Sequence, residues 1–414
     1  MGTPVLDMSD YRPVPEADEN TFRELVHYAF SPEDGPFEDA SSDSEPTIGD
    51  HRGLYDDHIT AVCRHYDLPV ELRASVIAAG GIGGVASDPA QRREGHVQEL
   101  LAESLAEYRD RDWRLAFLWP FDVGFYTNMG WATTSKLATW EITPDDLDGM
   151  AATDAGNGRF KRLSADDWRR LEPVQRADHD TALAVRRSEG WWREFVFDRY
   201  DKTPYVYGWV VDGDVRGYLA YTIQGGDDGR TLVVREQAAI DTAARCQLFR
   251  FCRDHDSQVN QIKFYTPAEA VTGDGFDPHL YLDDPGACDA TVTAGAMGRL
   301  VDVEADLPAI GGATATTTRF DLVVTDPLAD WNDGRFQVTV GNDGIEQSIR
   351  ASDEYQSAQI PTAHLGIGPL SQVVIGARSA DELAHSGEIT GDDEAITALG
   401  DCFQPTQPMM RENF

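Results

Sequence analysis

Two adjacent arginines and a glycine, Arg92, Arg93 and Gly95, stand in the stretch QRREGHV (91–97). This stretch follows an apolar, glycine-rich run and precedes apolar residues at helical spacing over Glu94–Arg109. The start of a helix offers unpaired backbone N–H groups and the positive end of the helix dipole. Guanidinium groups bind phosphate through paired hydrogen bonds, and glycine lets a ligand approach the backbone closely. The pattern is typical of a pyrophosphate-binding loop, and an ordinary structural turn is the alternative.

The charge of the chain makes these arginines conspicuous. The 414 residues include 72 Asp and Glu against 35 Lys and Arg, which gives a formal net charge of −37. The acids are spread along the whole length, and the only lysines are Lys136, Lys161, Lys202 and Lys263. This pattern favours a halophilic protein, in which salt screens the self-repulsion, over an ordinary acidic one. It predicts no nucleic-acid partner and no membrane partner, since both are anionic.

The sequence also bears on compartment and on metal binding. No apolar run approaches the roughly 18 residues of a membrane span, and the N-terminus lacks the basic and apolar regions of a signal peptide. We therefore expect a cytoplasmic protein. The cysteines are odd in number and form no CxxC pair, so no metal site is predicted and most are expected to be small buried residues: Cys63, Cys246, Cys252, Cys288 and Cys402.

The elements around the arginine loop repeat a recognisable order. A strand and turn are predicted in SVIAAGGIGGVASDP before the loop, and a strand over Arg114–Trp119 after the helix. A short helix follows at Phe125–Met129, then a strand at Leu137–Ile142, whereas His51–His65 is predicted to be helical. The loop and the stretch FYTNMGW (125–131) together resemble the GCN5-related N-acetyltransferases. That family's loop ends in Gly or Ala, so Val97 is a departure.

This resemblance implies direct acyl transfer from the thioester of acetyl-CoA to a neutral amine. The backbone N–H of Val85 would hold the oxyanion, and Tyr126 would give a proton to the departing thiolate as general acid. A packed core aromatic is the alternative interpretation of Tyr126. The cofactor-binding residues expected from the resemblance are Val85, Ser87, Arg92, Arg93, Gly95, His96 and Val97.

The similarity extends along the whole chain. The run GIGGVASDPAQRREGHVQELL, the stretch GFYTNMGW and the junction TAGAMGRLVDV (293–303) resemble the enhanced intracellular survival (Eis) acetyltransferases. The resemblance implies an α+β fold with tandem acetyltransferase domains, each a mixed sheet flanked by helices, and a sterol-carrier-protein-like α/β domain. We expect these domains at 1–150, 151–305 and 306–414. The second domain has no Arg-x-x-Gly loop after its strand Thr231–Gln237, which predicts a silent scaffold.

The same resemblance gives the chain end a role. The C-terminal carboxylate of Phe414 would be the general base, although chain ends are usually frayed. The expected substrate is a primary amine of a small polyamine or aminoglycoside, and the expected assembly is a homo-oligomer, with a hexamer as the family's form. Acids at Asp34, Glu38, Asp39 and Glu412 would attract a polycation or would be plain surface carboxylates. The alternatives are a carrier of an apolar ligand that uses the third domain, or a protein acetyltransferase.

Overall fold

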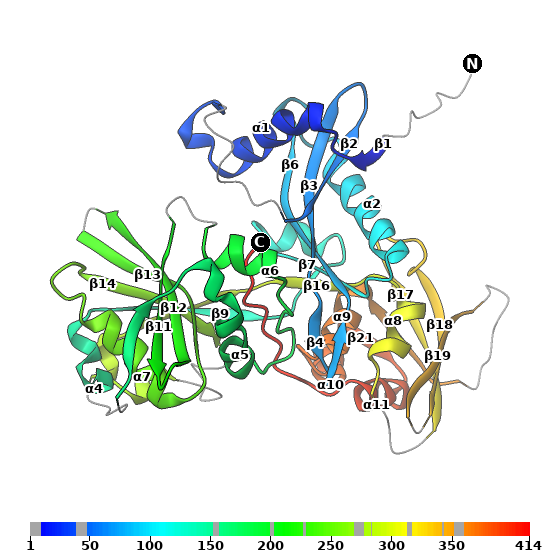
Figure 1. Ribbon diagram of the computed structural model, residues 1–414. Coiled ribbons are helices and arrows are strands. Elements are labelled where there is room, and N and C mark those ends of the chain that lie inside the picture. Colours follow the sequence, from blue (N-terminus) through cyan, green and yellow to red (C-terminus); the bar gives the residue numbers. More distant parts are fainter. Residues whose placement is uncertain are drawn as a thin grey trace. The chain divides into compact units, whose positions relative to one another are not determined.

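The computed structural model describes residues 10–38, 48–151, 157–198, 203–226, 229–268, 277–282, 284–312, 317–341, 343–351 and 360–414. The chain divides into two compact units, which Figure 1 shows with the labels used below. The first unit contains 49–134 and 296–414 with the N-terminal segment. The second contains 135–295 with the short segment 43–48.

The first unit is built on a seven-stranded sheet. Its strands, in spatial order, are β1 (Asp10–Pro13), β2 (Asp50–Tyr55), β3 (Ile59–Asp67), β6 (Ala79–Ser87), β7 (Leu115–Leu118), β16 (Met297–Leu300) and β8 (Ala132–Thr133). β6 and β7 run parallel, as a crossover through a helix requires, and the other pairs are antiparallel. The connecting helix is α2 (His96–Asp110), and α3 (Val123–Thr127) follows β7.

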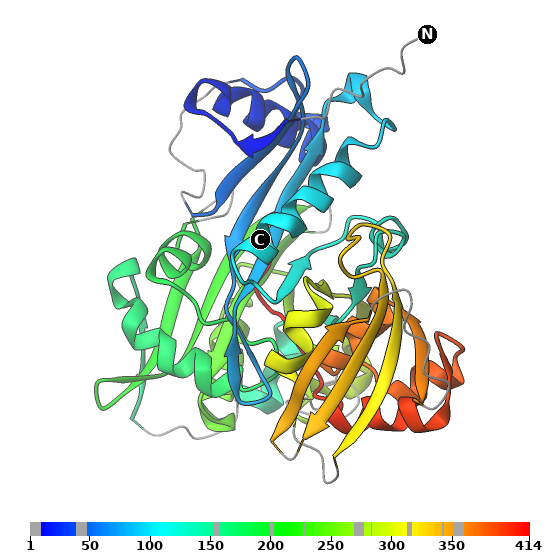
Figure 2. The ribbon, with the colours of Figure 1, turned by 90° about the vertical axis from the view of Figure 1, so that its right-hand side faces the viewer.

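The two faces of this sheet are covered by different helices (Figures 1 and 2). α1 (Glu19–Phe30) packs on the face that carries Val62 and Ala86, through the buried Phe22 and Leu25. α2 packs on the opposite face, where Leu101 meets a core of aliphatic and aromatic side chains. A small hairpin of β4 (Val70–Leu72) and β5 (Ser75–Ile77) precedes β6. Alternate residues of β3 and β6 therefore pack into two different hydrophobic cores, one on each face of the sheet.

The C-terminal part of the first unit has its own five-stranded sheet. The order is β19 (Gly344–Arg350), β18 (Gly334–Gly341), β17 (Thr318–Thr325), β20 (Thr362–Gly366) and β21 (Ile389–Gly391). Its helices are α8 (Val303–Ile310), α9 (Ile367–Ile375), α10 (Ala380–His385) and α11 (Asp393–Cys402). The buried pair Arg299–Asp326 joins this part to β16, and the Arg299 guanidinium also stacks on the Trp131 ring at 5.0 Å.

The second unit has another seven-stranded sheet. Its order is β10 (Arg159–Arg162), β11 (Tyr205–Val211), β12 (Asp214–Gly226), β13 (Gly229–Ala239), β14 (Gln261–Pro267), β9 (Lys136–Ile142) and β15 (Asp289–Ala294). β13 and β14 are parallel and are joined through α7 (Thr242–Arg253), which carries two buried cysteines. The other helices are α4 (Asp148–Ala151), α5 (Trp168–Asp178), α6 (Glu189–Trp191) and a π-helical turn at Trp192–Val196.

Two strands lie in a different sheet from the one that the sequence order suggests. The prediction placed Leu137–Ile142 in the first domain, but β9 pairs with β14 and β15 in the second sheet. β16 follows the second domain in sequence but pairs with β7 and β8 in the first sheet. The expected ranges 1–150 and 151–305 therefore do not coincide with the compact units. Each of these two strands lies between two others, next to the edge of its sheet, and pairs with the backbone groups of both neighbours.

One predicted helix is wrong. His51–His65 forms the antiparallel strands β2 and β3 instead of a helix. β3 is buried on both faces, so its apolar and polar residues do not alternate and the sequence pattern does not distinguish a strand from a helix. The helix predicted at Glu94–Arg109 is confirmed as α2.

Candidate active site

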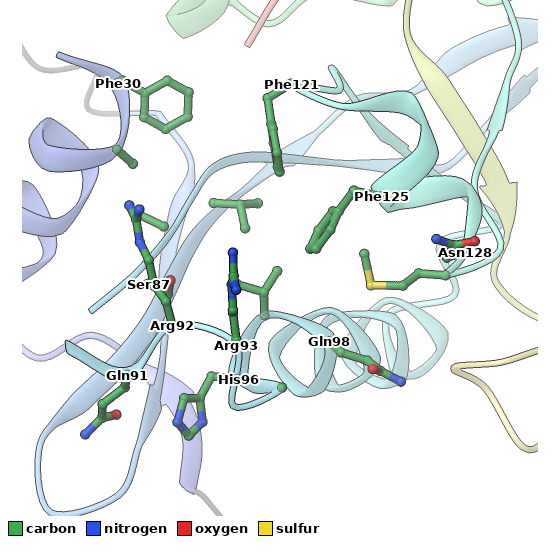
Figure 3. A pocket seen from close by; sticks show the side chains of 16 residues that line it. Phe30, Ser87, Gln91, Arg92, Arg93, His96, Gln98, Phe121, Phe125 and Asn128 are labelled. Atoms are coloured by element: carbon green, nitrogen blue, oxygen red, sulfur yellow. The ribbon is translucent and has the colours of Figure 1, made fainter. Parts of the chain in front are cut away.

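The strand β6, the loop after it and the start of α2 enclose one pocket of about 1010 Å³ in the first unit. All seven residues expected to bind the cofactor line this pocket: Val85, Ser87, Arg92, Arg93, Gly95, His96 and Val97. The rest of the wall comes from the end of α1 and from the segment of α3, which contribute Phe30, Phe121, Phe125, Asn128 and Met129 (Figure 3). The structure thus brings together residues from β6, the loop after it, α2, α1 and the segment around α3.

The N-terminus of α2 is open toward the pocket. Its cap residue Gly95 has φ 95°, and no side chain caps the helix there. The first intrahelical bond runs from the N–H of Glu99 to the carbonyl of Gly95 at 3.1 Å. The N–H groups of the preceding first turn therefore have no partner within the helix. A β-carbon at Gly95 would have open space within 4 Å, so the left-handed backbone, and not crowding, favours glycine here.

Arg92 and Arg93 supply positive charge at this helix start. Within the described ranges, neither guanidinium forms an ion pair or a hydrogen bond, although most other arginines of this acidic chain do. The Arg92 guanidinium lies over the Tyr28 ring at 5.3 Å from its centre, which holds it at the end of α1. Arg93 has φ 69°. Figure 3 shows both side chains extending toward the space below Phe30 and Phe121.

His96 and Val97 contribute differently from the arginines. The His96 ring lies away from Arg92 and Arg93 in Figure 3, and its Nε2 is 3.5 Å from the carboxylate of Glu94. His96 is the first residue of α2, so its backbone N–H belongs to the open first turn of the helix. Val97 is half-buried and packs on the core cluster below α2. Its side chain, which is larger than the Gly or Ala expected at this position, therefore occupies core space beside the pocket.

A bulge in β6 lies at the edge of the pocket. Ala86 pairs with Val62 and Gly83 with Arg64, so two residues of β6, Gly84 and Val85, oppose one residue of β3. Gly84 has φ 60°, which an ordinary ladder does not use. A bulge of this kind leaves the extra residue unpaired and turns its backbone groups out of the ladder. The predicted oxyanion donor, the N–H of Val85, falls at this bulge, and Ser87 ends the strand.

Tyr126 lies on α3, which Asp122 caps by accepting the N–H of Phe125 at 2.8 Å. The Tyr126 side chain is almost fully buried and packs edge-on against Phe121, Phe125 and Trp131. Its hydroxyl makes no hydrogen bond to the described part of the chain. Burial raises the pKa of Tyr126 above its ordinary value, so the phenol stays protonated at neutral pH.

The chain end is buried in the first unit and is not frayed. Met409, Met410 and Phe414 are buried, and the Trp119 indole donates a hydrogen bond to the carbonyl of Glu412 at 2.8 Å. The ring centres of Phe414 and Tyr66 on β3 are 5.3 Å apart. The terminal carboxyl group lies over Gly83 of β6. The tail thus reaches the strand that carries the bulge.

A buried ionic network holds β2, β3 and α2 together behind the site. Arg52 and Tyr11 donate to the carboxylate of Glu107 at 2.6–2.8 Å, and His65 bonds the Ser104 hydroxyl at 3.0 Å. Burial opposes ionisation of Glu107, but the hydrogen bonds from Arg52 and Tyr11 lower its pKa to about 2. Burial lowers the pKa of His65 to about 3. His65 is therefore neutral, and the positive charge that balances the Glu107 carboxylate is that of Arg52.

Sequence reasoning missed the aromatic wall of the pocket. Phe121 is 76% exposed and Phe30 61% exposed, which is unusual for phenylalanine. Phe30 ends α1 and Phe121 lies between β7 and α3, so the two residues are far apart in sequence and no spacing links them. Among the acids proposed to attract a polycation, Asp34 and Glu38 are exposed, Glu412 is buried, and Asp39 lies outside the described residues.

The corresponding place in the second unit is closed. β13 and α7 are separated only by Ile240 and Asp241, whereas residues 88–95 separate β6 from α2. The Asp241 carboxylate accepts the N–H of Ala244 at 2.8 Å and pairs with Arg216. An acid therefore occupies the position in which α2 presents open N–H groups, as expected for a domain without a pyrophosphate loop.

Comparisons with known proteins agree with this geometry. Residues 10–134 and 183–300 each match an acetyltransferase (GNAT) domain model, and residues 303–411 match a sterol carrier protein domain. An uncharacterized N-acetyltransferase of Streptomyces avermitilis is 25% identical over 97% of both chains. One of Streptomyces griseus is 25% identical over 76% of both chains.

Solved structures share the whole fold. A probable N-acyltransferase from Enterococcus faecalis V583 has a TM-score of 0.82 at 21% identity, covering 98% of this chain and 100% of that one. Eis1 from Mycobacterium abscessus has a TM-score of 0.71 at 20% identity with the same coverage.

The chain therefore belongs to the GCN5-related N-acetyltransferases and is an acyltransferase. Its two acetyltransferase domains and its sterol carrier protein domain follow the Eis-like organisation. Enzymes of this class use acetyl-CoA as the acyl donor. No helix in the described ranges has the length and apolarity to cross a bilayer.

Proposed function

We propose that the first domain transfers acetyl directly from acetyl-CoA to a primary amine of a small polyamine or aminoglycoside-like substrate. The observation that carries the proposal is the position of Arg92 and Arg93, which have no ion pair within the described residues, at the open N-terminus of α2 in one pocket with the bulge at Val85. The pyrophosphate would lie on the N–H groups of the first turn, and the thioester carbonyl would accept the N–H of Val85.

The acid and the base would act from opposite faces of β6. Ile82 belongs to the core cluster that contains Tyr126, whereas the next residue, Gly83, faces the terminal carboxyl group of Phe414. The carboxylate would accept the proton of the attacking amine. The protonated Tyr126 phenol would donate to the thiolate of coenzyme A as the C–S bond breaks.

The burial of the cysteines favours direct acetyl transfer to the amine over a mechanism in which a cysteine is first acetylated. The cysteines are all buried. Burial raises the pKa of the Cys63 thiol, the one on β3, to about 12. A thiol in this environment is a poor nucleophile, because the thiolate is the reactive form.

The substrate amine, the hexameric assembly, the cytoplasmic location and the adaptation to high salt stay predictions. A protein amine as acceptor is the alternative within the same chemistry. A ligand of the sterol carrier protein domain is a separate matter, and no observation favours a purely non-catalytic carrier.

The test is acetyl-CoA binding and thiol release with polyamines and aminoglycosides at high salt. We expect binding and amine-dependent thiol release, and Tyr126→Phe should lower kcat by about a hundredfold without changing the Kd of acetyl-CoA. Tyr221→Phe in the second unit is the matched control and should leave kcat unchanged. Absence of acetyl-CoA binding would overturn the proposal.

The base assignment has its own test. One residue added after Phe414 displaces the carboxylate, so kcat should fall while acetyl-CoA still binds. Unchanged turnover of the extended chain would show that another group is the base.

A further inference from the structure

Two glycines of β6 lie directly under the last residue of the chain. A β-carbon built on Gly81 would come within 2.6 Å of the Phe414 ring. One built on Gly83 would be 3.1 Å from the Phe414 carboxyl carbon and 3.2 Å from a carboxyl oxygen. Neither glycine has a positive φ, so backbone conformation does not require glycine at either position. Glycine is required at these positions because Phe414 leaves too little room for a β-carbon.

The two glycines occupy one face of the strand, since they alternate with Ile82. β3 supplies the neighbouring side chains on that face, because Tyr66 pairs with Gly81 and Arg64 pairs with Gly83 across the ladder. The Tyr66 ring lies 3.0 Å from the position of the β-carbon at Gly83 and 5.3 Å, between ring centres, from Phe414. The terminal residue is therefore held on a surface made by two adjacent strands.

Arg64 is itself fixed in place. Its Nε donates to the His51 ring at 2.8 Å, its other end reaches the Tyr66 hydroxyl at 3.4 Å, and His51 pairs with Glu19 at 2.8 Å. Arg64 thus stands across the ladder from Gly83, the residue that lies under the Phe414 carboxyl group, and its contacts with His51 and Tyr66 fix the Tyr66 side of this surface.

From these contacts we propose that Gly81 and Gly83 are positioning residues for the terminal residue, Gly81 for the phenyl ring and Gly83 for the carboxylate. We call this pair the terminal seat. The inference rests on the proposed function, in which the carboxylate is the base. It adds that the absence of side chains at Gly81 and Gly83, and not the tail alone, sets the position of the base relative to the bulge at Val85.

The two glycines should respond differently to added methyl groups. Gly83→Ala presses on main-chain atoms of Phe414, so the carboxylate must move by a few tenths of an ångström whatever the last side chain is. Gly81→Ala presses on the phenyl ring and on the Leu68 side chain, and a smaller terminal residue can relieve much of that. Misplacement of a reacting group by about 1 Å costs up to about a hundredfold in rate.

The experiment measures kcat, the KM of the amine and the Kd of acetyl-CoA for four variants and one control. We expect Gly83→Ala to lower kcat about tenfold with an unchanged Kd of acetyl-CoA. Gly81→Ala should also lower kcat, and Phe414→Leu should restore much of the loss in the Gly81→Ala background but none in the Gly83→Ala background. Gly400→Ala on α11, where the added carbon lies 3.6 Å from its neighbour, controls for the substitution and should leave kcat unchanged.

The outcomes separate this inference from the proposed function. If extension past Phe414 abolishes turnover while Gly83→Ala leaves kcat unchanged, the terminal seat is overturned and the base assignment stands. If Phe414→Leu restores both glycine variants equally, the division between ring and carboxylate is wrong. If extension has no effect, the base assignment itself fails. Thermal unfolding midpoints like that of the unsubstituted chain show that lost turnover is not lost folding.

Discussion

The starts of α2 and α7 follow equivalent parallel strands, yet one is open and the other is capped. At α2, eight residues form a loop that ends on Gly95, and two arginines without ion partners in the described chain stand beside free N–H groups. At α7, Asp241 follows the strand almost at once and its carboxylate takes the N–H of Ala244. The same helix end can therefore bind an anion or be stabilised by the protein's own anion, and the loop decides which.

The largest test of this difference is to give α2 the cap of α7. Gly95→Asp places a carboxylate where the pyrophosphate would bind, and like charges brought together cost several kcal/mol. We expect the Kd of acetyl-CoA to rise by at least about a hundredfold in calorimetric titration. Gly95→Asn is the matched control, because asparagine also tolerates a left-handed backbone but is neutral. Equal losses in both variants would mean that backbone strain, and not charge, decides.

A smaller effect is expected when one arginine is removed. Arg92→Ala deletes charge-assisted hydrogen bonds to phosphate, so the Kd should rise by about tenfold to a hundredfold, with little change in kcat. Arg169→Ala in the second unit, where the side chain is 71% exposed and pairs with Glu189, should change neither. A fall in kcat at unchanged Kd would place Arg92 in the chemical step instead.

Acid should destabilise the first unit through His65. Its pKa is lowered to about 3 by burial, from 6.5 in the unfolded chain. The unfolded state therefore binds more protons between these values, and the unfolding free energy falls as the pH drops below about 6.5, by up to about 1.4 kcal/mol per pH unit. The pKa of Glu107 is lowered to about 2, so protonation of Glu107 reduces the unfolding free energy further only between about pH 4.5 and 2.

The measurement is the unfolding free energy from urea titrations at pH 7, 6 and 5. His65→Gln should flatten this slope even where it lowers stability at pH 7. An unchanged slope would locate the acid sensitivity elsewhere.

The smallest effect is expected at the cap of α7. Asp241→Ala removes the cap and should cost about 1 kcal/mol of unfolding free energy. It should not create a second cofactor site, because the connection between β13 and α7 is too short to form a loop. The binding stoichiometry should stay at one acetyl-CoA per chain, and two would contradict this account.

The local parts of the site could be predicted from the sequence. Arg92, Arg93 and Gly95 are neighbours in a loop between a strand and a helix, and short-range spacing is enough to imply an anion site. The helix predicted at Glu94–Arg109 rests on the same short-range spacing and is confirmed as α2. The helix predicted at His51–His65 failed, because a strand buried on both faces has no alternating pattern to distinguish it from a helix.

The sequence by itself determined the acetyltransferase class, the arginine–glycine loop at 92–95 and the absence of such a loop in the second domain, because each is defined by consecutive residues. Only the tertiary structure decided which sheet β9 and β16 complete, and that Phe30 and Phe121 form the wall of one pocket. It also decided that Phe414 lies on Gly81 and Gly83, more than 300 positions earlier in the numbering. These pairings depend on close packing between distant segments, for which no local propensity gives a signal.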